Sequence, residues 1–306
     1  MPPIIPPGEV VFGMQLPIQS QSRLYVAEWE TTAGVEELVR VAQAADEAGF
    51  FYVAVCDHVA IPERLAAAMG TTWYDAVATL GFVAGLTERV RLLSHVYVVP
   101  YRHPMVVAKS FATLDHLSGG RAILGVGAGH VQEEFALLGA DFDRRGRVLD
   151  ERLAIVAEAL EREFVDGFGA RPRPSQQPRP PIWVGGSSPA AIRRAARWDG
   201  WLPQGTPRVE MPAQIALLRA ERERLGLPTA PFDLGTVCEP VYVGEPTWDV
   251  GRRVISGSPE RLAASLREFV VMGVNQLQVR FAARSCDELV DQISAFGAEV
   301  APLVRG

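Results

Sequence analysis

The chain has 306 residues, of which 48% are hydrophobic and 22% charged. This composition is typical of a globular protein and excludes a disordered chain. The net charge of −6 gives no general attraction to nucleic acid or to an anionic membrane. No apolar run approaches the ~20 residues that a membrane span needs, and residues 1–7 lack the features of a signal peptide. We therefore expect a cytoplasmic protein.

The three cysteines lie far apart in the sequence. Cys56, Cys238 and Cys286 form no Cys-X-X-Cys pair and no Cys/His spacing of the kind that binds zinc. The sequence therefore predicts neither a disulfide framework nor a metal site.

The first half of the chain alternates between apolar strands and amphipathic helices. Gly49 follows the first predicted helix, where a C-terminal cap favours glycine. Pro104 opens the third, where the first helical turn tolerates proline. The predicted strands are 10–16, 51–56, 90–99 and 122–126, and the predicted helices are 35–48, 74–86 and 104–118.

The same alternation continues in the second half. A stretch rich in glycine and proline, about 164–180, interrupts it, and the alternation then resumes at once. Two long loops, 18–33 and 245–257, are predicted near the mouth of the fold. The predicted helices are 147–160, one opening at Ser188-Pro189, 212–225, 259–272 and 287–301, and the strands are 182–184, 201–203, 234–243 and 275–281.

Eight strands alternating with about eight helices are typical of a closed parallel (β/α)8 TIM barrel. We therefore predict one barrel domain over residues 1–306, with the 164–180 stretch as an excursion inside it. A two-domain, doubly wound α/β protein is the alternative fold.

Asp57 and His58 directly follow the second predicted strand. Barrel enzymes build their sites from the carboxyl ends of strands and the loops that follow. An imidazole can exchange a proton near neutral pH, and an adjacent carboxylate can orient it. This position favours a catalytic role over a structural one. His95, near the end of the third strand, could face either the barrel interior or the outer helices.

Two glycine-rich bends follow strands. Gly125-Val126-Gly127-Ala128-Gly129 lacks the spacing of a dinucleotide-binding loop, but its glycines allow close backbone approach to a flat or anionic ligand. Gly185-Gly186-Ser187-Ser188-Pro189 leads into a helix, whose N-terminus can attract a phosphate. Simple turn chemistry is the alternative for the second bend.

Several short motifs follow one another in a fixed order along residues 34–205. They are Gly49-Phe50, Asp57-His58-Val59-Ala60-Ile61-Pro62, Tyr101-Arg102-His103-Pro104, Ala112-Thr113-Leu114-Asp115, Leu117-Ser118-Gly119-Gly120-Arg121, Leu124-Gly125-Val126-Gly127-Ala128-Gly129, Glu133-Glu134-Phe135 and Pro181-Ile182-Trp183-Val184-Gly185-Gly186. Together they resemble the bacterial luciferase-like family, and specifically its branch of oxidoreductases that depend on the deazaflavin coenzyme F420.

The resemblance implies a TIM barrel that transfers a hydride at the deazaflavin ring. It places Asp57 and His58 beside that ring, with His58 as proton donor or charge stabiliser. It also implies a non-proline cis peptide near the end of the third strand, most simply Val96-Tyr97. The other implied cofactor contacts are Val96, Tyr97 and Val99 behind the ring, Gly127, Gly129 and Glu133 at the ring or its polyol arm, and Gly185, Gly186 and Ser187 at the phosphate end.

Two departures from the family pattern bear on the substrate. His130 stands where some sugar-phosphate dehydrogenases of the family carry a catalytic glutamate, so we expect two imidazoles, His58 and His130, to face one substrate. The aromatic-rich insertion that often covers the pocket is shortened here to residues 164–168.

The resemblance thus predicts an oxidoreductase that transfers a hydride between F420 and a small organic molecule, reducing an activated C=C, C=N or C=O bond. One alternative is a monooxygenase that receives reduced FMN from a partner reductase. A second alternative is a non-catalytic barrel subunit. A homodimer is also expected by resemblance.

Overall fold

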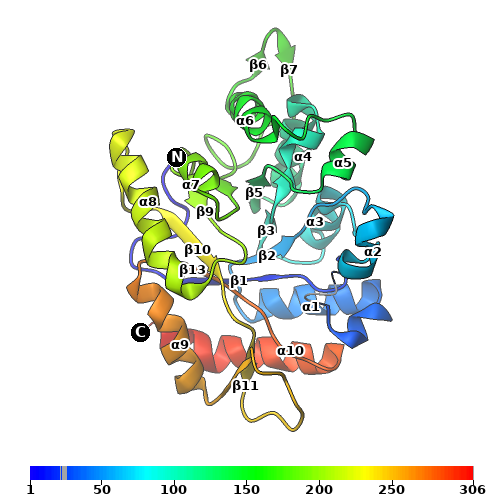
Figure 1. Cartoon of the computed structure of the whole chain (residues 1–306), viewed down its shortest axis with the longest axis vertical. Coiled ribbons are helices and arrows are strands. Elements are labelled where there is room, and N and C mark those ends of the chain that lie inside the picture. Colours follow the sequence, from blue (N-terminus) through cyan, green and yellow to red (C-terminus); the bar gives the residue numbers. More distant parts are fainter. Residues whose placement is uncertain (21, 23–25, 306) are drawn as a thin grey trace.

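A computed structural model describes residues 1–20, 22 and 26–305. Figure 1 shows these residues as a ring of strands surrounded by helices. The predicted loop at 18–33 is described only in part, since residues 21 and 23–25 lie outside the described residues.

The predicted eight-stranded barrel is confirmed. The strands pair in parallel around the barrel, and the last strand, β13, pairs with the first, β1, so that the barrel is closed. Strands β3 and β4 count as one of the eight barrel strands, because both pair with β5. The barrel strands are β1 (Val11–Gln15), β2 (Tyr52–Val55), β3 (Arg91–Ser94), β4 (Tyr97–Val98), β5 (Ala122–Gly127), β8 (Ile182–Val184), β9 (Gly200–Trp201), β10 (Asp233–Val237) and β13 (Gln276–Val279).

Helices cover the outside of the barrel (Figure 1). Two of them, α2 and α5, fall where the sequence predicted only loops. The helices are α1 (Val35–Glu47), α2 (Glu63–Met69), α3 (Ala76–Ala84), α4 (Pro104–Leu117), α5 (Gln132–Leu137), α6 (Arg145–Glu161), α7 (Pro189–Ala195), α8 (Met211–Arg224), α9 (Pro259–Val271), α10 (Cys286–Ala295) and α11 (Ala301–Arg305).

Two of the predicted strands are in fact interrupted. The segment 234–243 divides into β10 and β11 (Val241–Val243), and β11 pairs outside the barrel with β12 (Ile255–Gly257). Pro240 precedes β11 and has no N–H to donate, so it is a natural place for the ladder to stop. The segment 90–99 divides into β3 and β4. Within the 164–180 stretch, residues 164–169 form a small hairpin, β6 (Phe164–Val165) and β7 (Phe168–Gly169).

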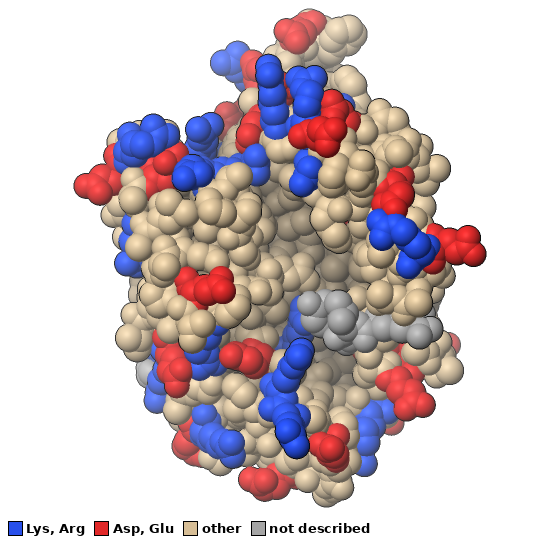
Figure 2. Space-filling view, viewed as in Figure 1, with Lys and Arg blue, Asp and Glu red and all other residues tan. Residues whose placement is uncertain are grey.

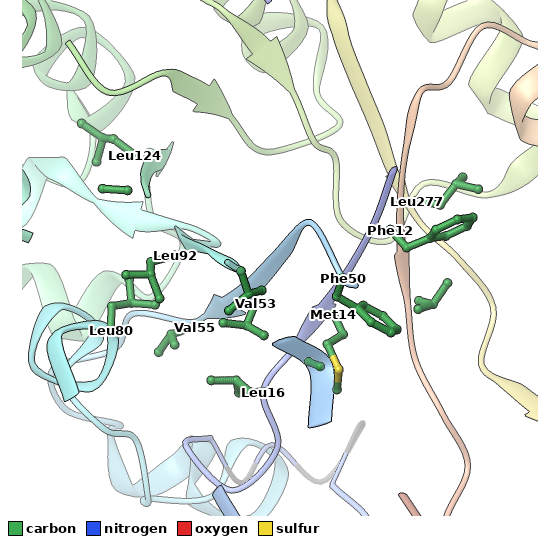
Figure 3. Packing of buried hydrophobic residues seen from close by; sticks show 14 of the residues in the cluster. Phe12, Met14, Leu16, Phe50, Val53, Val55, Leu80, Leu92, Leu124 and Leu277 are labelled. Atoms are coloured by element: carbon green, nitrogen blue, oxygen red, sulfur yellow. The ribbon is translucent and has the colours of Figure 1, made fainter. Parts of the chain in front are cut away.

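Barrel strands are buried on both faces, which is why they read as unbroken apolar runs. Along β2, Val53 and Val55 pack in the layer between the barrel and its helices, whereas Tyr52 and Ala54 belong to a second cluster inside the barrel. Figure 3 shows part of this outer layer, in which Leu80 of α3 lies beside Leu92 of β3. This period-two alternation fixes which side chains face the interior.

The amino-terminal end of the barrel is closed by aromatic side chains and by the first residues of the chain. Tyr52 and Trp183 pack edge to face inside it, with ring centroids 5.7 Å apart. The buried carboxylate of Asp233 accepts hydrogen bonds from the backbone N–H groups of Ile4 (3.1 Å) and Ile5 (3.2 Å) and from Trp183 Nε1 (3.1 Å). The carboxyl end therefore remains as the open mouth.

Candidate active site

A cavity of about 870 Å³ opens at the carboxyl ends of the strands. Figure 2 shows this face hollowed at its centre, with uncharged residues on most of the walls. Many sequence-predicted site residues meet here, although they come from strands far apart in the sequence. Those that line the cavity are Asp57, His58, Val96, Gly127, Gly129, His130, Gly185 and Gly186.

The floor of the cavity is built by the break between β3 and β4. The cis peptide bond lies between His95 and Val96, so the predicted position, Val96-Tyr97, is wrong by one residue. The side chain of Val96 projects between two glycines. A Cβ atom at Gly127 would lie 2.4 Å from Val96 Cγ2, and one at Gly185 would lie 2.4 Å from Val96 Cγ1. The two glycines thus leave space for an apolar side chain at the base of the cavity.

His58 is held by Glu134 of α5. Its Nδ1 lies 2.9 Å from Glu134 Oε2, and the Tyr101 hydroxyl donates to the same oxygen at 2.8 Å. The backbone N–H groups of Val59 and Ala60 donate to Oε1. Burial raises the pKa of Glu134, but the contacts with His58 and the two amides outweigh it, so that the pKa is lowered overall. The carboxylate is therefore ionised near neutral pH.

Asp57 lies beside this group but has different partners. Its Oδ2 accepts from Arg102 Nη1 at 2.6 Å and from the backbone N–H of Val98 at 2.8 Å, and its Oδ1 accepts from Arg102 Nη2 at 2.8 Å. The Arg102 guanidinium also lies over the Tyr97 ring, 4.1 Å from its centroid. Asp57 thus fixes the backbone of β4, and among the described residues no hydrogen bond joins its side chain to His58.

Two rings flank His58 at the cavity wall. The Trp73 ring lies 4.4 Å away between centroids, and the His130 ring lies 5.5 Å away, both edge to face. Partial desolvation, followed by the neighbouring His58 imidazole, lowers the pKa of His130. The predicted pair of imidazoles facing one space is therefore present.

His95 faces the barrel interior, which settles the alternative that the sequence left open. Its Nε2 lies 3.2 Å from the carbonyl oxygen of Leu202. Burial lowers its pKa to about 4, so the imidazole is neutral and Nε2 carries the proton that bonds to Leu202. Within the described part of the chain, Nδ1 has no hydrogen-bond partner and is left as a buried acceptor.

Two arginines, Arg145 and Arg194, also line the cavity. Arg194 is bound to both carboxylate oxygens of Asp150, at 2.5 and 3.0 Å. Arg145 lies over the Phe142 ring, 3.9 Å from its centroid, and donates to the carbonyl oxygen of the same residue. No carboxylate partner of Arg145 is found among the described residues. The cavity wall at Arg145 is therefore suited to an anion.

Four predicted cofactor contacts do not line the cavity. Glu133 lies on the surface in an ion pair with Arg64, with its side chain 42% exposed, and the adjacent Glu134 takes the buried position. Tyr97 and Val99 belong to the buried core. Ser187 lies beside the rim, where its hydroxyl is 2.6 Å from that of Thr206.

Sequence reasoning did not assign roles to three residues that hold the site together, namely Glu134, Tyr101 and Arg102. All three occur within the motifs quoted above, so a signal was present. The motifs do not show which residues bind each other, because Asp57 and Arg102 are 45 residues apart in the sequence and His58 and Glu134 are 76 residues apart.

The described residues contain no group of three or more His, Cys, Asp or Glu side chains arranged to hold a metal ion. All three cysteines are free thiols. Over the same residues, no helix is both long and apolar enough to cross a bilayer.

The chain resembles known proteins along most of its length. The family described as luciferase-like monooxygenase matches residues 10–247. An uncharacterized protein of Mycobacterium bovis is 31% identical over 259 residues, which cover 75% of this chain and 89% of the relative. A protein of Mycobacterium tuberculosis, also uncharacterized, matches to the same extent.

Solved structures share the fold. Monooxygenase RslO1 from Streptomyces bottropensis superposes with a TM-score of 0.78 at 23% identity, covering 95% of this chain and 99% of that one. An F420-dependent secondary alcohol dehydrogenase in complex with an F420–acetone adduct gives 0.76 at 16% identity, covering 97% and 100%. The barrel, the cavity at its carboxyl end and the match over residues 10–247 together lead to one conclusion: this chain belongs to the luciferase-like monooxygenase family.

Proposed function

We propose that this luciferase-like protein is an oxidoreductase that binds coenzyme F420 and transfers a hydride between it and a small organic substrate. The reduction of an activated C=C, C=N or C=O bond is the preferred direction. The observation that carries the proposal is the apolar floor at Val96 with His58 beside it, because a flat ring above Val96 would bring its reacting face within reach of an imidazole.

The cavity fits a ring cofactor with an anionic arm. Its volume of about 870 Å³ lies within the roughly 300–1,000 Å³ range of small-molecule sites. Val96 and Val98 supply apolar surface for one ring face. Gly127 and Gly185 lack a Cβ atom, and this leaves the room that the Val96 side chain fills at the floor of the cavity. Arg145, which also lines the cavity, matches the negative charge that deazaflavin and flavin arms both carry.

When bound, coenzyme F420 would supply or accept the hydride. The chain's own residues would bind, orient and exchange a proton. His58 has its Nδ1 directed to Glu134, so Nε2 is the atom that can exchange a proton with substrate. His130, whose ring packs against that of His58, lines the same cavity. Asp57 would act through the β4 backbone and Arg102, and not by direct proton transfer.

A monooxygenase that uses reduced FMN is the second candidate. It is favoured by the family description itself, luciferase-like monooxygenase. Solved structures with this fold include a Baeyer–Villiger monooxygenase constituent in complex with FMN. In that case a partner reductase would supply the reduced flavin, and the same floor and the same arginine would hold it.

The deciding experiment is a titration of the purified chain with F420 and, separately, with FMN, each oxidised and reduced, followed by fluorescence or absorbance. We expect micromolar affinity for F420 and at least tenfold weaker binding of FMN. Micromolar affinity for FMN without F420 binding would overturn the first choice. Binding of neither would favour a non-catalytic barrel. Glu133→Gln, which removes a charge at the surface, is the matched control for variants that remove a charge near the site.

A further inference from the structure

We infer that Glu134 is the positioning residue for His58, holding the proton of the neutral imidazole on Nδ1 and directing the lone pair of Nε2 into the cavity. This inference deepens the proposed function, on which its catalytic consequence rests. It assigns a role to the second glutamate of the Glu133-Glu134 pair and a supporting role to Tyr101.

The carboxylate of Glu134 is buried next to His58, which itself lines the cavity. Four groups converge on it: His58 Nδ1 at 2.9 Å, the Tyr101 hydroxyl at 2.8 Å, and the backbone N–H groups of Val59 and Ala60. Its residue is 1% exposed. Because the two amides and the hydroxyl can only donate here, the oxygens are fixed as acceptors, and their orientation does not depend on whether His58 is present.

An ionised carboxylate has no proton to donate, so the 2.9 Å contact requires a proton on Nδ1 of His58. The neutral imidazole then carries its lone pair on Nε2. Among the described residues, Nε2 has no hydrogen-bond partner, and His58 lines the cavity. Nε2 can therefore accept a proton from substrate, or return it after His58 has been protonated, without a change of ring orientation.

Among the described residues, the two carboxylates nearest in sequence to this pair are bound elsewhere. Asp57 is adjacent in sequence, but both of its oxygens are bound to Arg102. Glu133 is the other adjacent candidate, and it pairs with Arg64 on the surface. The ring packing of Trp73 against His58, at 4.4 Å between centroids, restricts rotation of the imidazole but cannot select a tautomer.

The test reads the tautomer directly in the ligand-free chain. Histidine labelled with ¹⁵N gives two-bond ¹H–¹⁵N correlations that distinguish Nδ1–H from Nε2–H, at about pH 9, above the ordinary imidazole range. Only five histidines are present, and His58→Gln identifies the signal of interest. We expect Nδ1–H in the unmodified protein and a loss of at least half of that tautomer in Glu134→Gln, because the introduced amide can turn its N–H₂ toward Nδ1.

Glu133→Gln is the matched control, with the same charge change one residue away, and should leave the tautomer unchanged. Tyr101→Phe keeps the carboxylate and should also keep Nδ1–H. Two results would overturn the inference. One is an Nε2–H tautomer of His58 in the unmodified protein, which can be read even if Glu134→Gln does not fold. The other is an unchanged tautomer in a folded Glu134→Gln variant.

The catalytic consequence is measured separately. With the cofactor identified by titration, Glu134→Gln should lower kcat by about 100-fold, as expected when a general acid–base group is misoriented, while the cofactor Kd changes less than about threefold. An unchanged kcat would also count against the inference. If neither F420 nor FMN binds, the proposed function fails. The tautomer of His58 is measured without a cofactor, so it tests the role of Glu134 independently of that result.

Discussion

Asp57 and Arg102 form a two-pronged ion pair inside the mouth of the barrel, with N–O distances of 2.6 and 2.8 Å. Their side chains are 2% and 16% exposed. Asp57 also receives the Val98 amide at 2.8 Å, so the pair links the end of β2 to β4 and to the turn after it. The residue that the sequence marked as catalytic is thus primarily a structural anchor for the cavity floor.

Removing one member of this pair should destabilise the protein. Arg102→Met leaves the Asp57 carboxylate buried without its cation, and breaking a buried pair in this way costs about 3–5 kcal/mol. Urea unfolding measures the change. The control is Arg147→Met, which breaks an exposed pair with Glu151 and should cost less than about 1 kcal/mol. Equal losses in the two variants would contradict the assigned role of Asp57.

The fit of Val96 between two glycines predicts a compensating pair of substitutions. Gly127→Ala places a methyl 2.4 Å from Val96 Cγ2, so we expect a loss of stability of about 1–3 kcal/mol and at least tenfold weaker cofactor binding. Val96→Ala in the same chain should recover most of the stability. Gly81→Ala on α3, where a Cβ atom meets nothing within 4 Å, is the control. Failure of Val96→Ala to compensate would contradict the packing.

Asp233 predicts a pH dependence of stability. Burial raises the pKa of its carboxyl from an ordinary value of 3.8 to about 6. Between about pH 4 and 6 the folded state therefore binds more protons than the unfolded state. The contribution of the Asp233 carboxyl to the free energy of unfolding is therefore fully present below about pH 4. Roughly 3 kcal/mol of stability is lost as the pH rises through 6.

Comparison with Asp233→Asn isolates this effect from other titrations. The variant keeps a neutral acceptor beside Ile4, Ile5 and Trp183. Urea unfolding at pH values from 4 to 8 should show that the unmodified protein loses stability relative to the variant by roughly 3 kcal/mol over this interval. A difference that is constant with pH would show that Asp233 does not titrate in the folded state.

Arg145 should contribute to cofactor affinity through charge. Arg145→Gln removes a cation that lines the cavity, and we expect about tenfold weaker cofactor binding, with a smaller difference at high salt because screening reduces the attraction. Arg147→Gln is the control, since Arg147 lies on the same helix and pairs with Glu151 outside the cavity. Equal effects from both variants would point to a general charge effect in place of a specific contact.

The structure confirms the parts of the prediction that depend on local pattern. Unbroken apolar runs identified the barrel strands, because both faces of a parallel barrel strand are buried. The glycines at 127 and 185 were predicted to allow close approach of a ligand, and in the structure each leaves room for the side chain of Val96. The cis peptide was predicted one residue too late. The position of the break in the strand depends on how Val96 fits against Gly127 and Gly185, and the sequence does not show that these residues are neighbours.

The choice between Glu133 and Glu134 could not be made from sequence. Adjacent residues on a helix point about 100° apart, so Glu134 is buried against His58 whereas Glu133 is partly exposed to solvent. The two residues are chemically identical and sit in the same motif. Only the way α5 packs against the loop after β2 decides which of them meets His58.

The sequence by itself determined the alternation of strands and helices, the Asp57-His58 pair at a strand end and the positions of the glycine bends, because each depends on residues close in the chain. Only the tertiary structure decided that Asp57 binds Arg102 and that His58 binds Glu134. The physical reason is barrel closure, which brings the ends of β2, β4 and β5 together and lets charged side chains remote in sequence satisfy one another away from water.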